Sequence, residues 1–304
     1  MSFYSKVTYI KKLLSEKLKF LYLVILEFIP GNNFSISYYY GRLGNNLQQI
    51  ANGIAYSEIN QTRFTSKFHP HIDIISVGKR KYFFIKKYRF FNYENKRVIN
   101  EDAPKNAGLS YDKIIPNIHR IFQEIIFPNI TFFKNINIPE DTLVIHIRSG
   151  DIFEKTKHFD QVQNPLNFYL EIIKNFKDIL IITSEARNNP VIKHLLSLKN
   201  HNVKIQSSSV EEDFNVLINA TNLCLSGVGT FGIAAALLSP NLKNLYYSNL
   251  YMKSHLNPEM VDSSKVNKYK YKVYNYLEIG EWMNSYQNIK LMLDSSVKVK
   301  QISK

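Results

Sequence analysis

The sequence predicts an α/β protein whose C-terminal half folds as a doubly wound parallel sheet. From about residue 140, five short apolar segments alternate with segments of helical periodicity over about 110 residues. The first of them, TLVIHIR, is a continuous apolar run of the kind that is buried in a parallel sheet. This alternation is typical of βαβ units joined into one sheet.

The individual elements follow from local signals. The expected strands are TLVIHIR, DILIITS, VKIQS, TNLCLSG and NLYYSN, with NLYYSN as the last strand. Pro190 stands at the start of one expected helix, NNPVIKHLLSLKN, and the helix SSVEEDFNVLINA has an acidic first turn. The segments NPLNFYLEIIKNF and GIAAALLSP complete the expected helices.

The N-terminal half is less regular. FSISYYY is an expected strand, and GRLGNN connects it to the helical segment LQQIANGIAYSEI. IHRIFQEIIFPNI is an expected helix that Pro128 ends. We therefore divide the chain into a leader at residues 1–34, an N-terminal domain at 35–139 and a C-terminal domain at 140–304.

The composition is that of a folded, basic protein. Hydrophobic residues make up 45 % of its 304 residues, which is enough for a sizeable core and excludes a disordered chain. Lys and Arg outnumber Asp and Glu by 39 to 25, giving a formal net charge of +14. This excess indicates an anionic partner, namely nucleotide phosphates, anionic lipid or glycan, or nucleic acid. Lys-rich residue usage gives the same balance without any such partner.

The single cysteine and the leader bear on the compartment. Cys224 lies in an apolar run, is expected to be buried, and can form no internal disulfide, so we expect a reducing, cytoplasmic location. The leader has five lysines and an apolar run that Glu27 interrupts and Pro30 closes, short of the about 20 residues that span a bilayer. Residues 1–30 are predicted either to pack on the protein or to lie on the anionic cytoplasmic face of a membrane.

Parallel sheets bind ligands at the carboxyl ends of their strands, and three segments here lie at such ends. They follow Arg148, Glu185 and Gly227. In the first, VIHIRSGDIF, an arginine precedes a Ser-Gly turn, and its planar guanidinium is suited to a diphosphate. Ser149 and the Gly150 N–H are possible further donors, and Asp151 either orients Arg148 or acts on substrate. The alternative is a surface ion pair of Arg148 with Asp151, and a core histidine at His146.

Two further segments contain closely spaced glycines. In LCLSGVGTFGIAAALL, a strand ends at Gly227-Val228-Gly229-Thr230 and a helix of small residues follows, as where a helix N-terminus meets a phosphate. Small residues there also serve close helix–sheet packing. In GRLGNNLQQIA, residues 41–51, glycines and amides follow an expected strand, which indicates a backbone close to a polar ligand.

Together these three segments carry a resemblance to a known family. GRLGNNLQQIA resembles the G-x-L-G-N-Q-x-F-Q-x-A segment of alpha-1,2-fucosyltransferases of glycosyltransferase family 11. VIHIRSGDIF resembles the H-x-R-R-G-D peptide of the wider fucosyltransferase superfamily. EEDFNVLINATNLCLSGVGTFGIAAALL is similar to the family's closing motif, so the resemblance covers about residues 37 to 240 in the family's order.

The resemblance implies a two-lobed, GT-B-like glycosyltransferase that inverts configuration without a metal. The acceptor-side lobe is N-terminal, and the C-terminal lobe holds the nucleotide-sugar donor. Arg148 binds the donor diphosphate, and the other donor-binding residues are His146, Ser149, Asp213, Ser226, Gly229, Thr230 and Phe231. The interlobe loop consists of Gly41, Gly44, Asn45, Asn46 and Gln49.

The chain departs from the family pattern at several positions. Ser149 replaces the second arginine, Gln48 the aromatic residue and Asn46 the glutamine, while Gly-Ile-Ala follows Phe231. The run FDQVQNPLNFY marks a distinct branch. GDP-fucose is the donor that the family implies, and another GDP-deoxysugar or a UDP-hexose stays open. The acceptor implied is a cell-surface glycan or lipid-linked oligosaccharide.

An inverting transfer calls for a general base or a very good leaving group. Asp151, Glu154, His158 and Asp160 are candidates for the base; we favour Glu154 for that role and Asp151 for organising the donor loop. The His69-Pro-His71-Ile-Asp73 segment has metal-ligand spacing without a partner motif, so a solvent-facing loop is favoured over a metal site.

Two other classes of function remain open. One is a glycan-binding protein that has lost transfer activity. The other is a nucleic-acid-binding protein that uses the basic and aromatic segment from Lys79 to Arg89. Its clustered aromatic residues are more typical of a core element with lysines at its edge, so we expect no nucleic-acid partner.

Overall fold

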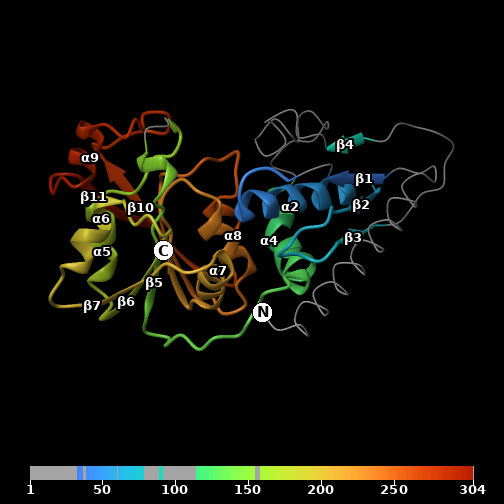
Figure 1. Ribbon diagram of the computed structural model, residues 1–304, viewed down its shortest axis with the longest axis horizontal. Coiled ribbons are helices and arrows are strands. Elements are labelled where there is room, and N and C mark those ends of the chain that lie inside the picture. The colour runs from blue at the N-terminus through green and yellow to red at the C-terminus, as the bar shows by residue number, and fades with distance from the viewer. Residues whose placement is uncertain are drawn as a thin grey trace, which may run out of the picture. The chain divides into compact units, whose positions relative to one another are not determined.

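The structure is a computed structural model that describes residues 33–36, 39–59, 61–78, 89–91, 114–154 and 158–303 (Figure 1). The chain divides into two compact units. The N-terminal unit ends at Thr131, and the C-terminal unit begins at Phe132, where the sequence had placed the boundary after residue 139. Residues 42–48 also belong to the C-terminal unit. Residues 1–32 of the predicted leader and residues 79–88 of the basic segment lie outside the described residues, and the last two residues of the predicted leader belong to β1.

The N-terminal unit contains a four-stranded sheet with the order β3-β2-β1-β4. Its strands are β1 (Asn33–Ile36), β2 (Arg63–Thr65), β3 (Ser76–Val77) and β4 (Arg89–Phe91). β1 is parallel to β2 and β4, while β3 is antiparallel to β2. The predicted strand at 34–40 is therefore confirmed in its first half, with β1 ending at Ile36.

Helix α2 (Leu43–Ile59) begins four residues before the predicted segment. The Arg42 carbonyl accepts hydrogen bonds from the N–H groups of Asn45 and Asn46, at 2.9 and 3.1 Å, and so begins the helix. Further along, the apolar residues recur on a buried stripe, which includes Leu47, Ile50, Ala51 and Ile54. The glycines and amides that were expected in a loop are thus mainly helical.

The helix predicted at 118–130 is confirmed with a more varied geometry. It comprises α4 (Ile115–Arg120), a π-helix (Ile121–Ile126) and a 3-10 turn (Phe127–Asn129). Pro116 occupies the helix start, where its missing N–H costs nothing. Pro128 ends the stretch as expected, since the turn finishes one residue later.

The C-terminal unit is built on a seven-stranded sheet with the order β11-β10-β9-β8-β5-β6-β7. The strands are β5 (Leu143–His146), β6 (Asp178–Ile182), β7 (Asn202–Gln206), β8 (Asn222–Cys224), β9 (Asn244–Ser248), β10 (Asn267–Tyr274) and β11 (Lys298–Ser303). All neighbouring pairs are parallel except β10 with β11. The five predicted strands and the predicted α/β class are confirmed.

Four helices connect the parallel strands, and Figure 1 shows α5 and α6 on one side of the sheet and α7 and α8 on the other. They are α5 (Leu166–Ile173), α6 (Pro190–Leu196), α7 (Val210–Asn219) and α8 (Phe231–Leu238), with a further α9 (Tyr286–Met292). The Asn189 side chain caps α6, and Ser209 with Glu212 forms a capping box at α7. In the described part of the chain, no helix is long and apolar enough to cross a membrane.

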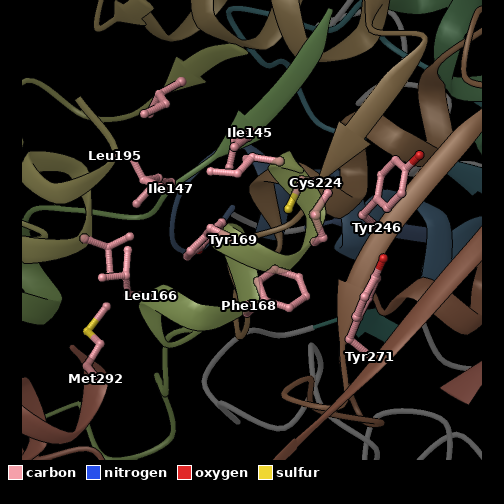
Figure 2. Close-up of a cluster of buried hydrophobic side chains, with 14 of the residues drawn as sticks. Ile145, Ile147, Leu166, Phe168, Tyr169, Leu195, Cys224, Tyr246, Tyr271 and Met292 are labelled. Carbon is pink, nitrogen blue, oxygen red and sulfur yellow. The ribbon is translucent and has the colours of Figure 1, made fainter. Parts of the chain in front are cut away.

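The core on the α5 side of the sheet is rich in aromatic residues (Figure 2). Phe168 and Tyr169 of α5 are fully buried, and the Phe168 ring meets Tyr271 of β10 edge-on at 5.7 Å. Cys224 belongs to the same cluster and is fully buried, as predicted, and burial raises the pKa of its thiol. Along β5, Leu143, Ile145 and Ile147 lie in this cluster, so the alternate residue His146 faces α8.

Strands β10 and β11 were not predicted, and the expectation that NLYYSN is the last strand was wrong. Lysine and other polar residues alternate with apolar or aromatic ones in much of NKYKYKVY and KVKQIS, because only one face of each strand meets the core. Tyr271 and Val273 lie on that face, whereas the lysines alternate with them. A search for continuous apolar runs passes over such one-sided strands.

Gly53, in the interior of α2, should not tolerate replacement by a larger residue. A Cβ at this position would lie 2.3 Å from the ring of Phe64, which is fully buried. Alanine favours helices by about 1 kcal/mol over glycine, but overpacking of this kind costs about 1–3 kcal/mol, so we expect Gly53→Ala to be destabilising overall.

Urea unfolding followed by circular dichroism measures this loss. In a Phe64→Leu background the collision is relieved, and Gly53→Ala should then cost less than in the wild type. An equal cost in both backgrounds would contradict the packing explanation.

Candidate functional site

The strand order places a topological switch point between β5 and β8. From β5 the chain continues to β6 and β7 on one side, and then returns to β8 on the other side of β5. Loops that leave the carboxyl ends of two such strands diverge and leave a crevice that commonly binds ligands. Here those loops begin at Ile147 and Leu225, so two of the three strand ends singled out from the sequence adjoin the switch point.

Arg148 lies at this point and is held by several groups. One Nη donates to the Gln161 Oε1, and the other lies 3.5 Å from Asp151 Oδ1. Its carbonyl accepts a hydrogen bond of 3.0 Å from the Asn189 side chain. Burial lowers the pKa of Arg148, and the Asp151 carboxylate counteracts that effect, so the guanidinium stays charged.

Asp151 lies between two arginines. Its Oδ1 faces Arg148, and its Oδ2 is 3.4 Å from a terminal nitrogen of Arg42, just before α2. The Arg42 side chain is 73 % exposed and that of Arg148 is 24 % exposed, so one cation is free to move and the other is fixed. Asp151 thus compensates two positive charges at the switch point. Its role in organising the donor loop stays a prediction.

His146 stabilises the floor of the site as a neutral side chain. Its Nδ1 lies 3.2 Å from Ser226 Oγ, and its ring lies 5.5 Å from that of Phe231 at the start of α8. Phe231 in turn packs on Phe214 of α7 at 4.8 Å. Burial, with a smaller contribution from the Arg148 charge, lowers the pKa of His146 to about 3. His146 and Phe231 therefore support the loops from beneath.

The glycine-rich turn after β8 is fixed by residues 161–164. Gly227 has a φ of +84°, and a Cβ there would lie 2.9 Å from the Val162 carbonyl. The Val228 N–H donates to the same carbonyl at 3.1 Å, and the Asn164 side chain donates to the Leu225 carbonyl at 2.9 Å. Gln161, which accepts from Arg148, is at the beginning of this segment. The loops after β5 and β8 are thereby joined.

The first turn of α2 packs directly on the start of α8. A Cβ at Gly44 would lie 2.7 Å from the Thr230 carbonyl carbon and 2.8 Å from the Phe231 nitrogen. Thr230 Oγ1 donates to Asn45 Oδ1 at 2.7 Å. Both helix N-termini carry partial positive charge and unpaired N–H groups, so their approach adds to the positive potential near Arg148. Gly229 lies beside the arginine, with its Cβ position 3.9 Å from Nη1.

The structure gives Ser149 and Gly150 supporting contacts. Ser149 is buried, and its Oγ accepts hydrogen bonds from Thr183 Oγ1 at 3.0 Å and from the Asn189 N–H at 3.3 Å. The Gly150 N–H, considered as a phosphate donor, instead donates to Asn188 Oδ1 at 2.7 Å. The loop after β6 therefore holds the loop after β5 in place.

Other predicted residues have different surroundings. Asp213 Oδ1 accepts from Gln206 and from the Ser208 N–H, so its carboxylate stabilises the turn between β7 and α7. Glu154 is exposed, and its hydrogen bonds are made by its backbone: the carbonyl accepts from the Asn284 side chain and the N–H donates to the Asp151 carbonyl. Neither carboxylate is brought to Arg148 by a described contact.

The interlobe loop expected from the sequence is mainly helical. Gly44, Asn45 and Asn46 lie in the first turns of α2 and belong to the C-terminal unit, whereas Gly41 and Gln49 belong to the N-terminal unit. Gly41 has a φ of +69° at the turn before the helix, and Gln49 Oε1 accepts from the Tyr40 N–H at 3.1 Å. Asn46 is buried.

Two residues of the site were missed from the sequence. Arg42 stands inside GRLGNN, where the glycines and amides, and not the arginine, were predicted to lie close to a ligand. Gln161 stands in FDQVQNPLNFY, which was noted only as a branch marker. Each joins the candidate site through its contact with Asp151 or Arg148.

The His69-Pro-His71 segment is a turn in the N-terminal unit. His69 is buried rather than solvent-facing, and its Nδ1 accepts from the His71 N–H at 3.1 Å. Burial lowers the pKa of His69 to about 4. Among the described residues, no group of three or more His, Cys, Asp or Glu side chains is arranged to hold a metal ion.

Comparison with known proteins gives no match. No protein-family model, curated protein or solved structure is significantly similar to this chain.

Gly44→Ala should weaken the C-terminal unit. The added methyl group meets backbone atoms of Thr230 and Phe231 at less than 3 Å, and such overpacking costs about 1–3 kcal/mol. The single tryptophan, Trp282, is fully buried in this unit and donates to the Ile152 carbonyl, so its fluorescence reports on unfolding here.

Gly229→Ala is the matched control, because its Cβ makes only ordinary contacts, at 3.9 Å and beyond. Equal stability losses in the two variants would contradict the close approach of the two helices.

Acidification should destabilise the C-terminal unit through His146. The pKa of this residue is about 3 in the folded protein and about 6.5 in the unfolded chain. Between these values only the unfolded chain binds the proton, so this stabilisation is complete above about pH 6.5 and declines as the pH falls. From about pH 7 to pH 5 the loss is about 2 kcal/mol.

Urea titrations of the Trp282 fluorescence at the two pH values measure this difference. In His146→Gln the decline should be shallower by that amount. A variant that keeps the full pH dependence would show that another group is responsible.

Proposed function

We propose that the switch point of the C-terminal unit binds the diphosphate of a nucleotide sugar and that the protein is an inverting glycosyltransferase. The observation that carries the proposal is the convergence of Arg148 and Arg42 on Asp151 beside the N-termini of α2 and α8. The resemblance of these segments to the fucosyltransferase superfamily supports a GT-B-like arrangement of the two units. The donor that we propose is GDP-fucose, and the acceptor is a cell-surface glycan or a lipid-linked oligosaccharide.

The arginines supply the chemistry that departure of a nucleoside diphosphate requires. Negative charge develops on the leaving phosphate oxygens during transfer, and cations already in place stabilise it more than they stabilise the bound donor. Arg148 is fixed by Gln161 and by its own carbonyl contact, so little reorganisation is needed. Arg42 is exposed and can follow the phosphate. Helix N-termini add partial positive charge at the same place.

In this proposal Asp151 pairs with the two arginines that the phosphate binds. Without a ligand, its two oxygens neutralise the two arginines at 3.4 and 3.5 Å. A diphosphate carries more charge and more acceptor oxygens, so it competes for the same guanidinium groups. Because both of its oxygens face arginines, we assign Asp151 to organising the donor loop rather than to the base. Glu154, His158 and Asp160 remain candidates for that role.

Titration calorimetry with GDP, UDP and CMP tests the binding step. We expect Arg148→Ala to weaken nucleoside diphosphate binding about 10- to 100-fold, since charge-assisted hydrogen bonds contribute about 1.5–3 kcal/mol. Arg42→Ala should weaken it less, because its guanidinium is mostly exposed. Lys204→Ala, an exposed cation on β7, is the control and should bind as the wild type does.

The outcomes separate the possible functions. Preference for GDP supports a fucose-type donor, whereas preference for UDP or CMP retains the glycosyltransferase proposal with another sugar. Slow hydrolysis of the bound nucleotide sugar distinguishes an enzyme from a protein that only binds glycan. Failure to bind any nucleotide, or equal binding by Arg148→Ala, would overturn the proposal.

A further inference from the structure

The register of β10 with β11 gathers lysines on one face of the sheet. Residues directly opposite each other in an antiparallel pair point to the same face, and Lys272 is opposite Lys300 while Tyr274 is opposite Lys298. Lys268 and Lys270 share this face because side chains alternate along a strand. The other face carries Tyr271 and Val273, which belong to the core. The lysine face therefore consists of Lys268, Lys270, Lys272, Lys298 and Lys300.

Only two of these five lysines, Lys268 and Lys270, are paired with a carboxylate in the described residues. Glu259 Oε1 lies 2.8 Å from Lys270 Nζ, and its Oε2 lies 3.6 Å from Lys268 Nζ. The other three lysines are exposed, and within the described residues none of them forms an ion pair. Lys272 instead lies 5.0 Å above the ring of its neighbour Tyr274.

Protection of a sheet edge explains only some of these residues. Lysines on an edge strand discourage pairing with other chains, and this accounts for Lys298 and Lys300 on β11. β10 is an interior strand between β9 and β11, so its lysines have no such purpose. Like charges directly opposite each other, as in Lys272 and Lys300, destabilise a sheet. Since folding does not require this loss of stability, we infer that the lysines are present for a function.

We propose that the lysine face binds the surface of an anionic phospholipid bilayer. Its uncompensated cations project from an extended sheet, which suits a continuous plane of headgroups better than a single discrete anion. Ile302 lies in β11 where the register with β10 shifts beside Lys270, and it is 48 % exposed, so an exposed apolar side chain lies near the charges. This surface lies on strands that do not contribute to the proposed nucleotide site.

Sedimentation of the full-length protein with vesicles tests the proposal. The vesicles are phosphatidylcholine alone and phosphatidylcholine mixed with phosphatidylglycerol. The test variant replaces Lys272, Lys298 and Lys300 with Gln. The control replaces Lys193, Lys199 and Lys204 with Gln; these are exposed, lie on or near α6 and β7 and lower the net charge equally.

We expect the wild type to bind only the mixed vesicles. The test variant should bind them about 100-fold more weakly, since each lysine near an anionic surface contributes about a factor of five. The control should keep most of the affinity and unfold at the wild-type temperature. The test variant should unfold at that temperature or above it, because it loses the repulsion between Lys272 and Lys300.

Equal losses in the two variants would overturn the proposal in favour of general charge attraction. Full retention in the test variant would overturn it in favour of another region, including the leader. Binding of an anionic polysaccharide that is lost in the test variant, without vesicle binding, would assign the face to glycan instead.

Discussion

A partly buried positive charge just after β5 is the constraint around which the C-terminal unit is arranged. Arg148 loses most of its hydration, so its guanidinium needs acceptors nearby, and Asp151 and Gln161 provide them. Gln161 can do so because residues 161–164 are hydrogen-bonded to the turn after β8. The loop after β6 contributes Asn188 and Asn189, which bind the backbone of the Arg148 loop. The loops after three strands, β5, β6 and β8, are thus hydrogen-bonded to one another around Arg148.

Glycine allows the second half of the site to approach the first. Gly44 and Thr230 meet at a distance that no side chain larger than hydrogen permits, and this contact brings the start of α2 to the start of α8. Arg42 precedes that helix start and reaches Asp151. The glycines and amides of GRLGNNLQQIA therefore allow a helix to pack closely at its N-terminus. The arginine among them, Arg42, makes the ionic contact with Asp151.

The sequence predicted those parts of the fold that depend on local signals. Strands β5, β6, β8 and β9 were recognisable because they are largely buried and apolar, and the edge strand β7 because it continues their alternation with helices. Arg148 was recognisable from its place after β5. Strands β10 and β11 were not, because their lysines occupy the exposed face and obscure the apolar alternation. The role of Arg42 depends on a contact across more than 100 positions of the chain, which no local pattern contains. For the same reason Asp213 matched a motif, yet its carboxylate stabilises a turn two strands away from β5.

Hydrogen exchange measured by mass spectrometry with and without GDP tests the central claim most directly. The account predicts slower exchange in residues 147–154 and 226–234, which carry Arg148, Asp151 and the start of α8, with no change in β10 and β11. Slower exchange confined to other segments, while calorimetry shows that the nucleotide binds, would contradict the placement of the diphosphate at the switch point.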